Sequence, residues 1–236
     1  MKSHDYIVYS KKYSHIGITG SFIIAFRDIP LLLKNYLGGV KCLDYGCGAG
    51  RSTRFLKAQG LDVMGVDISA EMINEAKNKD PLGDYRLINS ASVPCEDGTF
   101  DLVFSSFVFL EVPTLDEIVQ ILEEMRRLIK DDGIILFVTS IVTDYKSDFI
   151  SFSYDFDENN LPLQTHCHNI KLLIKDENIV LYDYNYTYEE YCTAIKRAGL
   201  SIKEMHAPLG QPTDNVDWLD EAKKNYFYIF VLQKTK

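Results

Sequence analysis

Glycines and acidic residues recur at regular spacing around residue 45. Gly46, Gly48 and Gly50 alternate within the segment LDYGCGAG, which follows an apolar run and precedes a helix-period segment. Glycine permits unusual φ values and lets a ligand approach the main chain, while the start of the following helix offers free N–H groups. Asp67 ends the next apolar run, 23 residues after Asp44. A carboxylate there can accept hydrogen bonds from both hydroxyl groups of a ribose, so the pattern predicts a nucleoside-binding loop.

The glycine spacing separates two kinds of nucleoside ligand. A dinucleotide fingerprint has the form G-x-G-x-x-G, and counted from Gly46 its third glycine would fall at position 51. The chain has Arg51 at that position and its third glycine at Gly50. The spacing therefore favours a nucleoside-containing ligand whose tail is not a pyrophosphate.

The elements that must position this loop alternate as in an α/β protein. Short runs rich in β-branched and aromatic residues alternate with helix-period segments, which is typical of βαβ units around a parallel sheet. We predict a doubly wound, mostly parallel sheet of seven strands. The predicted strands are 40–46, 61–67, 85–89, 100–106, 133–140, 201–208 and 226–234, and the main predicted helices are 51–59, a helix capped by Ser69, and one that begins at Thr114 and is ended by residues 131–133.

Residues 141–190 interrupt this alternation. They are rich in Tyr and Phe and contain two alternating runs joined at 176–178, which predicts a β-hairpin. We interpret 141–190 as an inserted β-rich lid or substrate cap that covers the open edge of the sheet. Residues 1–140 and 191–236 then form the main domain, in which 16–26 is expected to be a buried N-terminal helix.

Composition narrows the class of protein. The chain has 236 residues, of which 46% are hydrophobic, and 25 Lys+Arg against 34 Asp+Glu give a net charge of −9. This acidic balance disfavours nucleic acid as the principal partner. The sequence also lacks an apolar run near the ~18 residues that span a bilayer. Five scattered cysteines without a C-x-x-C pair suggest reduced thiols in a cytoplasmic protein.

The joint pattern of Asp44, the glycine loop and Asp67 resembles the class I S-adenosylmethionine-dependent methyltransferases, whose first motif has the form D/E-x-G-x-G-x-G. The resemblance runs from about residue 40 to residue 140 and leaves the lid unmatched. It implies a Rossmann-like methyltransferase fold for residues 1–140 and 191–236. It also implies S-adenosylmethionine as the cofactor and S-adenosylhomocysteine as the product.

The resemblance further implies roles for the loop and the end of the second strand. Asp44 and the glycine loop, residues 46–50 with Cys47 among them, would hold the amino-acid end of the cofactor. Asp67 would bind the ribose hydroxyl groups, and Ile68 would pack on the adenine.

Other positions implied by the resemblance lie after the later strands. Asn89 stands where many relatives have Asp, and its amide oxygen can still accept a hydrogen bond from the adenine amino group. The backbone N–H of Ser90 would meet the ring, and Ser105 would lie near the transferable methyl. Tyr13 is either a packing residue or a contact made by an N-terminal helix that closes over the cofactor.

The function that follows is in-line methyl transfer to a nitrogen or oxygen nucleophile of a small molecule. Because the sulfonium leaving group is already activated, the protein mainly has to align the reacting atoms. His166 and His168 are the weak candidates for a general base, against surface or core roles for both. They lie too close to Cys167 for a familiar zinc ligand set, so no metal is expected.

Two alternatives stay open. One is an NAD-dependent oxidoreductase of Rossmann type, which the glycine spacing and the lack of a Tyr-x-x-x-Lys pair disfavour. The other is a non-catalytic S-adenosylmethionine-binding or regulatory protein, which an intact loop would fit equally well. The expected partner is a small-molecule methyl acceptor, with no nucleic acid or membrane, and a homodimer is left open.

Overall fold

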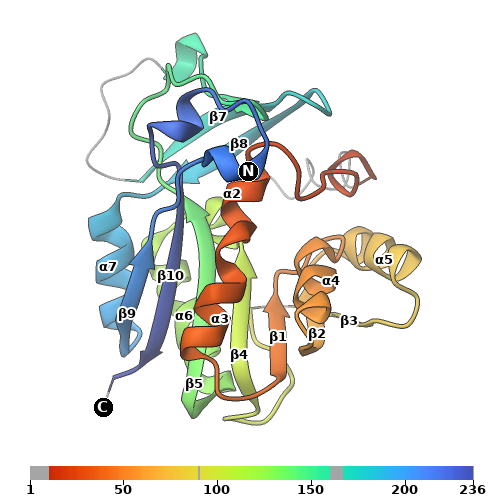
Figure 1. Ribbon diagram of the computed structural model, residues 1–236. Helices are drawn as coiled ribbons and strands as arrows, with labels where there is room; N and C mark the ends of the chain where they lie inside the picture. The colour runs from red at the N-terminus through yellow and green to blue at the C-terminus, as the bar shows by residue number, and fades with distance from the viewer. Residues whose placement is uncertain (1–10, 90, 160–166, 236) are drawn as a thin grey trace.

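The computed structural model describes residues 11–89, 91–159 and 167–235. Its main sheet has seven strands in the order β3-β2-β1-β4-β5-β10-β9 (Figure 1). The strands are β1 (Lys41–Tyr45), β2 (Asp62–Asp67), β3 (Asp84–Leu87), β4 (Phe100–Ser106), β5 (Ile129–Ser140), β9 (Leu200–His206) and β10 (Phe227–Lys234).

The strand directions confirm the predicted doubly wound, mostly parallel sheet. Strands β3, β2, β1, β4 and β5 pair in parallel, and β10 pairs antiparallel with both β5 and β9. The chain runs outward from β1 to β3 on one side and from β4 to β5 on the other. A sheet of this kind binds its ligand outside the carboxyl ends of the strands where the order reverses, here β1 and β4.

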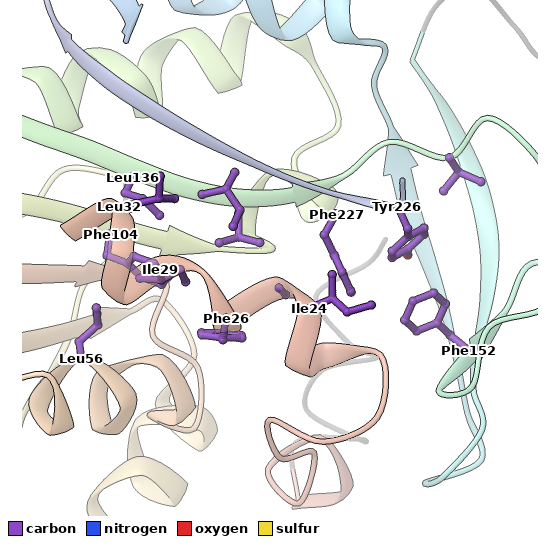
Figure 2. Packing of buried hydrophobic residues seen from close by; sticks show 14 of the residues in the cluster. Ile24, Phe26, Ile29, Leu32, Leu56, Phe104, Leu136, Phe152, Tyr226 and Phe227 are labelled. Carbon is purple, nitrogen blue, oxygen red and sulfur yellow. The ribbon is translucent and has the colours of Figure 1, made fainter. Parts of the chain in front are cut away.

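Helices cover both faces of the sheet. On one face α6 and α7 contact each other, and on the other Phe26, Ile29 and Leu32 pack with Phe104 of β4 (Figure 2). All these side chains are almost completely buried. The helices are α2 (Phe22–Arg27), α3 (Ile29–Tyr36), α4 (Arg51–Ala58), α5 (Ala70–Lys79), α6 (Leu115–Leu128) and α7 (Tyr188–Arg197).

Helix caps account for where several helices begin. The Ser69 hydroxyl accepts a hydrogen bond from the Met72 N–H, and the Thr114 hydroxyl accepts one from the Glu117 N–H, each at 3.2 Å. Both helix starts were predicted from the sequence. Such bonds satisfy backbone donors that an α-helix leaves free in its first turn. Within the described residues, no helix combines the length and apolar character that a membrane span requires.

Two predicted boundaries are wrong. The expected helix over 16–26 is shorter, because α2 begins only at Phe22 and α3 then continues the helical segment. Residues 131–133 do not end a helix but lie inside β5, whose pairing with β4 shifts register between Phe100 and Leu102. The shift accommodates extra residues of β5 in a bulge, so polar residues typical of a turn occur within a strand.

The region 141–190 contains a separate antiparallel sheet of three strands, β6 (Phe152–Ser153), β7 (His168–Ile174) and β8 (Ile179–Asn185). β7 and β8 form the predicted hairpin. We call these three strands the lid sheet. It does not cover an edge of the main sheet but lies beyond the carboxyl ends of the parallel strands (Figure 1). Tyr186, directly after β8, donates a hydrogen bond from its hydroxyl to the Val112 carbonyl at 2.8 Å, which holds the end of the hairpin against the segment after β4.

Candidate functional site

The glycine loop turns the chain sharply from β1 into α4. The N–H groups of Gly46 and Cys47 both donate to the carbonyl of Val66, each at 2.9 Å, which ties the loop to the end of β2. Gly46, Gly48 and Gly50 have φ values of 73°, 51° and 76°. These left-handed conformations strain any residue with a Cβ, which is the physical reason for glycine at alternate positions.

The loop leaves free space at its middle glycine. A Cβ built on Gly46 would lie 2.1 Å from Cγ2 of Val108, and one on Gly50 would lie 2.7 Å from the Tyr85 hydroxyl. A Cβ on Gly48 would meet nothing within 4 Å. The outer two glycines therefore permit close packing, whereas Gly48 borders a space that a ligand can occupy.

Asp67 joins this loop to the start of α5. Its Oδ2 accepts a hydrogen bond from the Gly48 N–H and its Oδ1 accepts one from the Ser69 N–H, both at 2.8 Å. Burial nevertheless raises the pKa of the Asp67 carboxyl, an effect that these backbone donors only partly offset. Each carboxylate oxygen keeps a further lone pair for a hydroxyl donor. The next side chain, Ile68, is 71% exposed and offers an apolar surface beside that carboxylate.

Asp44 lies beneath the loop and is completely buried. Its Oδ2 accepts hydrogen bonds from Ser52 at 2.7 Å and Thr53 at 2.5 Å, whereas its buried Oδ1 has no hydrogen-bond partner among the described residues. Burial raises the pKa of Asp44 to about 6, against the lowering effect of the two hydroxyl donors. An unfilled acceptor beside a glycine loop suits a cationic group such as an ammonium.

The other residues predicted to contact the cofactor differ in how far they are exposed. The side chain of Cys47 is buried, so it can meet a ligand mainly through its backbone, and Asn89 is exposed at the end of β3. Ser90 lies outside the described residues. Ser105 is 1% exposed, and its hydroxyl has no partner within the described chain. Ser105 lies on the same face of β4 as Val103, which packs in the core beneath α6. The predicted contact of Ser105 with the methyl group therefore stays a prediction.

A small cavity of about 40 Å³ lies between the carboxyl end of the main sheet and the lid sheet. Cavities of this size hold about two or three water molecules. Aromatic side chains from four parts of the chain form much of its wall, and two carboxylates, Glu111 and Asp183, also face it. The aromatic residues are Tyr13, Phe22, Phe107, Phe152, Tyr226 and Phe227.

The cavity adjoins the glycine loop. The Arg51 guanidinium, at the start of α4, lies 4.9 Å from the centre of the Phe22 ring and 5.6 Å from that of Phe107. Tyr13 lines the cavity and is also close enough to Arg51 and Asp67 for their charges to affect its pKa. Its pKa is raised chiefly by burial, and among the smaller effects the charges of Asp183 and Asp67 raise it further. The predicted cofactor loop and the aromatic cavity are therefore neighbouring parts of one site.

The structure does not bring the histidines into this cavity. His166 lies outside the described residues. The ring of His168 is hydrogen-bonded to the Tyr145 hydroxyl at 2.5 Å, and it is not among the residues that line the cavity. Sequence reasoning missed Asp183 and Glu111 instead. A signal for Asp183 existed, because it occupies an inward position in the alternating pattern of β8.

Comparisons with known proteins agree with this geometry. A family model described as a methyltransferase domain matches residues 43–137, from the middle of β1 to the second half of β5. A malonyl-[acyl-carrier protein] O-methyltransferase from Hamiltonella defensa is 31% identical over 48% of this chain, and the match spans 44% of that relative's length. An uncharacterised protein of Methanocaldococcus jannaschii is 28% identical over 100% of this chain and 88% of its own.

A solved structure extends the likeness to almost the whole fold. The crystal structure of a Pyrococcus horikoshii protein has a TM-score of 0.68 and 18% identity, and the match covers 97% of this chain and 99% of that one. At this identity the likeness concerns the fold. The chain is thus similar to a methyltransferase domain over residues 43–137, and similar in fold to the solved structure over almost its whole length.

Proposed function

We propose that this protein transfers a methyl group from S-adenosylmethionine, by in-line displacement, to a nitrogen or oxygen nucleophile of a small molecule. The observation that carries the proposal is the contact between the glycine loop and the cavity: Arg51, at the end of the loop, lies over two aromatic rings of the cavity wall. A methyltransferase needs a cofactor site and an acceptor site that meet in this way.

The residues around the loop fit the proposed cofactor. Gly48 borders free space, Asp67 has lone pairs left for ribose hydroxyl groups, and the exposed Ile68 can pack on the adenine. The unfilled Oδ1 of Asp44 supports an ammonium at the amino-acid end. Asn89 is exposed at the carboxyl end of β3, on the adenine side of this arrangement.

When bound, the cofactor supplies a methyl group on a positively charged sulfur, a leaving group that needs no proton. The work left to the chain is to position the acceptor and to exclude water. The aromatic walls from the N-terminal segment, from the residues after β4 and from the lid region are suited to both tasks. We also propose that residues 141–190 act as the substrate cap of a main domain made of 1–140 and 191–236.

The acceptor in the name of the Hamiltonella defensa relative fits the cavity poorly. A malonyl group on a carrier protein has a free carboxylate, and Glu111 and Asp183 give this cavity carboxylates of its own. Like charges in a site of low dielectric repel strongly. We therefore do not extend the malonyl substrate to this chain.

Calorimetry with the purified full chain tests the cofactor. S-adenosylhomocysteine should bind and NAD should not; binding of NAD without S-adenosylhomocysteine would overturn the proposal in favour of an oxidoreductase. Turnover is tested separately, by measuring S-adenosylhomocysteine formation with small amines and alcohols. A chain that binds the cofactor but methylates no member of such a panel would support the regulatory alternative.

A further inference from the structure

The carboxylate of Asp183 is a buried charged group that the proposed cofactor site does not use. It lies on β8, is 3% exposed and faces the aromatic cavity. Within residues 11–89, 91–159 and 167–235, no hydrogen bond or ion pair satisfies its side chain. A buried carboxylate without a partner is expensive to keep, so a fold that retains one has a use for its charge.

The surroundings of Asp183 indicate the charge of its partner. Phe152 and Tyr226, which lie side by side in Figure 2 with ring centres 4.4 Å apart, line the cavity. Phe22 and Phe107 complete much of the aromatic lining. Aromatic faces attract cations, and this attraction strengthens where water is excluded. A carboxylate surrounded by rings is the combination that binds an ammonium group.

We propose that Asp183 binds the protonated amino group of the methyl acceptor, so that the acceptor is a small amine whose apolar body lies against the aromatic walls. This inference rests on the proposed function and assigns its acceptor class. The small size of the cavity limits what enters it to the amino-bearing end of the acceptor.

The same contact prepares the nitrogen for reaction. A protonated amine has no lone pair for attack, so it first passes a proton to the Asp183 carboxylate. The neutral nitrogen then forms a bond to the methyl carbon as the bond from that carbon to sulfur breaks, and the electron pair of the broken bond stays on sulfur. The positive charge is now on the methylated nitrogen, and the proton on Asp183 leaves to solvent.

The ionisation of Asp183 should be visible in binding. Burial raises the pKa of the Asp183 carboxyl, so its ionised fraction increases as pH rises through the neutral range. An alkylamine, like a lysine side chain with its ordinary pKa of about 10.4, stays protonated across that range. Other titratable groups that face the cavity are Tyr13 of the N-terminal segment, Glu111 after β4 and Tyr226 before β10, and the charge of Asp183 also raises the pKa of Tyr154 and Tyr191.

Binding to the complex of the full chain with S-adenosylhomocysteine provides the test. The probes are benzylamine with benzyl alcohol and propylamine with propanol, two pairs that differ only in the polar group. Each amine should bind at least about tenfold more tightly than its alcohol, the usual worth of a hydrogen bond to a charged group. Amine affinity should also rise between pH 6 and pH 8.

Matched variants separate Asp183 from general effects on the fold. Asp183→Asn should abolish both the preference for amines and its pH dependence, while S-adenosylhomocysteine affinity stays as in the wild type. Asp176→Asn removes an exposed carboxylate from the turn of the same hairpin and should change neither.

Three results would overturn the inference. The amines bind no better than their alcohols, or Asp183→Asn keeps the amine preference, or the pH dependence is lost in Glu111→Gln but kept in Asp183→Asn. All three presuppose that S-adenosylhomocysteine binds. Its failure to bind would instead refute the proposed function, so the two failures are distinguishable.

Discussion

Replacement of Asp67 by Asn is the sharpest test of the cofactor site. The carboxylate now accepts one backbone hydrogen bond on each oxygen, from Gly48 and from Ser69, and keeps lone pairs for a ligand. Asn is almost the same size but has only one acceptor oxygen, and its NH2 group would face a backbone N–H donor. If Asp67 binds the ribose as proposed, the variant should lose one charge-assisted hydrogen bond to it and should disturb the glycine loop.

The size of the effect follows from the number of bonds lost. A hydrogen bond to a charged group contributes about 1.5 to 3 kcal/mol, which corresponds to a loss of about 10- to 150-fold in S-adenosylhomocysteine affinity. Stability of the ligand-free protein should change less. Burial already raises the pKa of Asp67, so removal of its charge relieves a desolvation cost that offsets part of the lost bonding.

Isothermal titration calorimetry with S-adenosylhomocysteine measures this difference, and thermal unfolding of the ligand-free protein checks the fold. Asp62→Asn is the matched control, because Asp62 is exposed at the opposite end of the same strand, β2. Equal affinities for wild type, Asp67→Asn and Asp62→Asn would show that the nucleoside does not bind at the carboxyl end of β2.

Three further predictions concern the glycine loop, Asp44 beneath it and the start of α7. Gly50→Ala should destabilise the protein more than Gly60→Ala in chemical denaturation, because both have positive φ, 76° and 87°, but only the Cβ at Gly50 would clash, with Tyr85. Equal losses would mean that backbone strain of about 1 to 2 kcal/mol accounts for both. Asp44→Asn should become more stable relative to wild type as pH rises. Since the folded pKa is raised from 3.8 to about 6, the stability that protonated Asp44 contributes is complete below pH 3.8 and is lost as pH rises through about 6, by on the order of 3 kcal/mol. A stability difference that is flat from pH 4 to pH 7 would contradict this. Glu190→Ala should cost about 1 to 2 kcal/mol in urea unfolding, since Glu190 accepts from the N–H groups of Thr187 and Cys167; no change would show that the cap is dispensable.

The central part of the fold was predictable because its signals are local. The run before Gly46 carries the apolar residues Val40, Cys42 and Leu43, the alternate glycines mark a turn with positive φ, and Asp67 ends the next run. β4 was predicted with its observed bounds, Phe100–Ser106. Each of these features depends on residues close together in the sequence, so a single chain carries enough information to recognise it.

The errors arise where distant parts of the chain determine the structure. Asp131 was expected to end a helix, but pairing with β4 extends β5 through it. Asp183 did not stand out in the sequence, where it is one acidic residue among many tyrosines. Its importance comes from enclosure by Phe22, Phe107 and Tyr226, residues up to 161 positions away in the chain. Periodicity can show that a position faces inward, but not which side chains surround it there.

The glycine loop and much of the cavity wall come from different parts of the sequence. The segment that matches the methyltransferase domain, residues 43–137, contains the glycine loop and Asp67. Much of the cavity wall comes from outside it, with Tyr13 and Phe22 before the segment and Asp183 after it. Under the proposed function, mutations in the outer segments can therefore change the choice of acceptor while the glycine loop stays intact. The cavity is a natural place to diversify substrate range in a library, with the main sheet held constant.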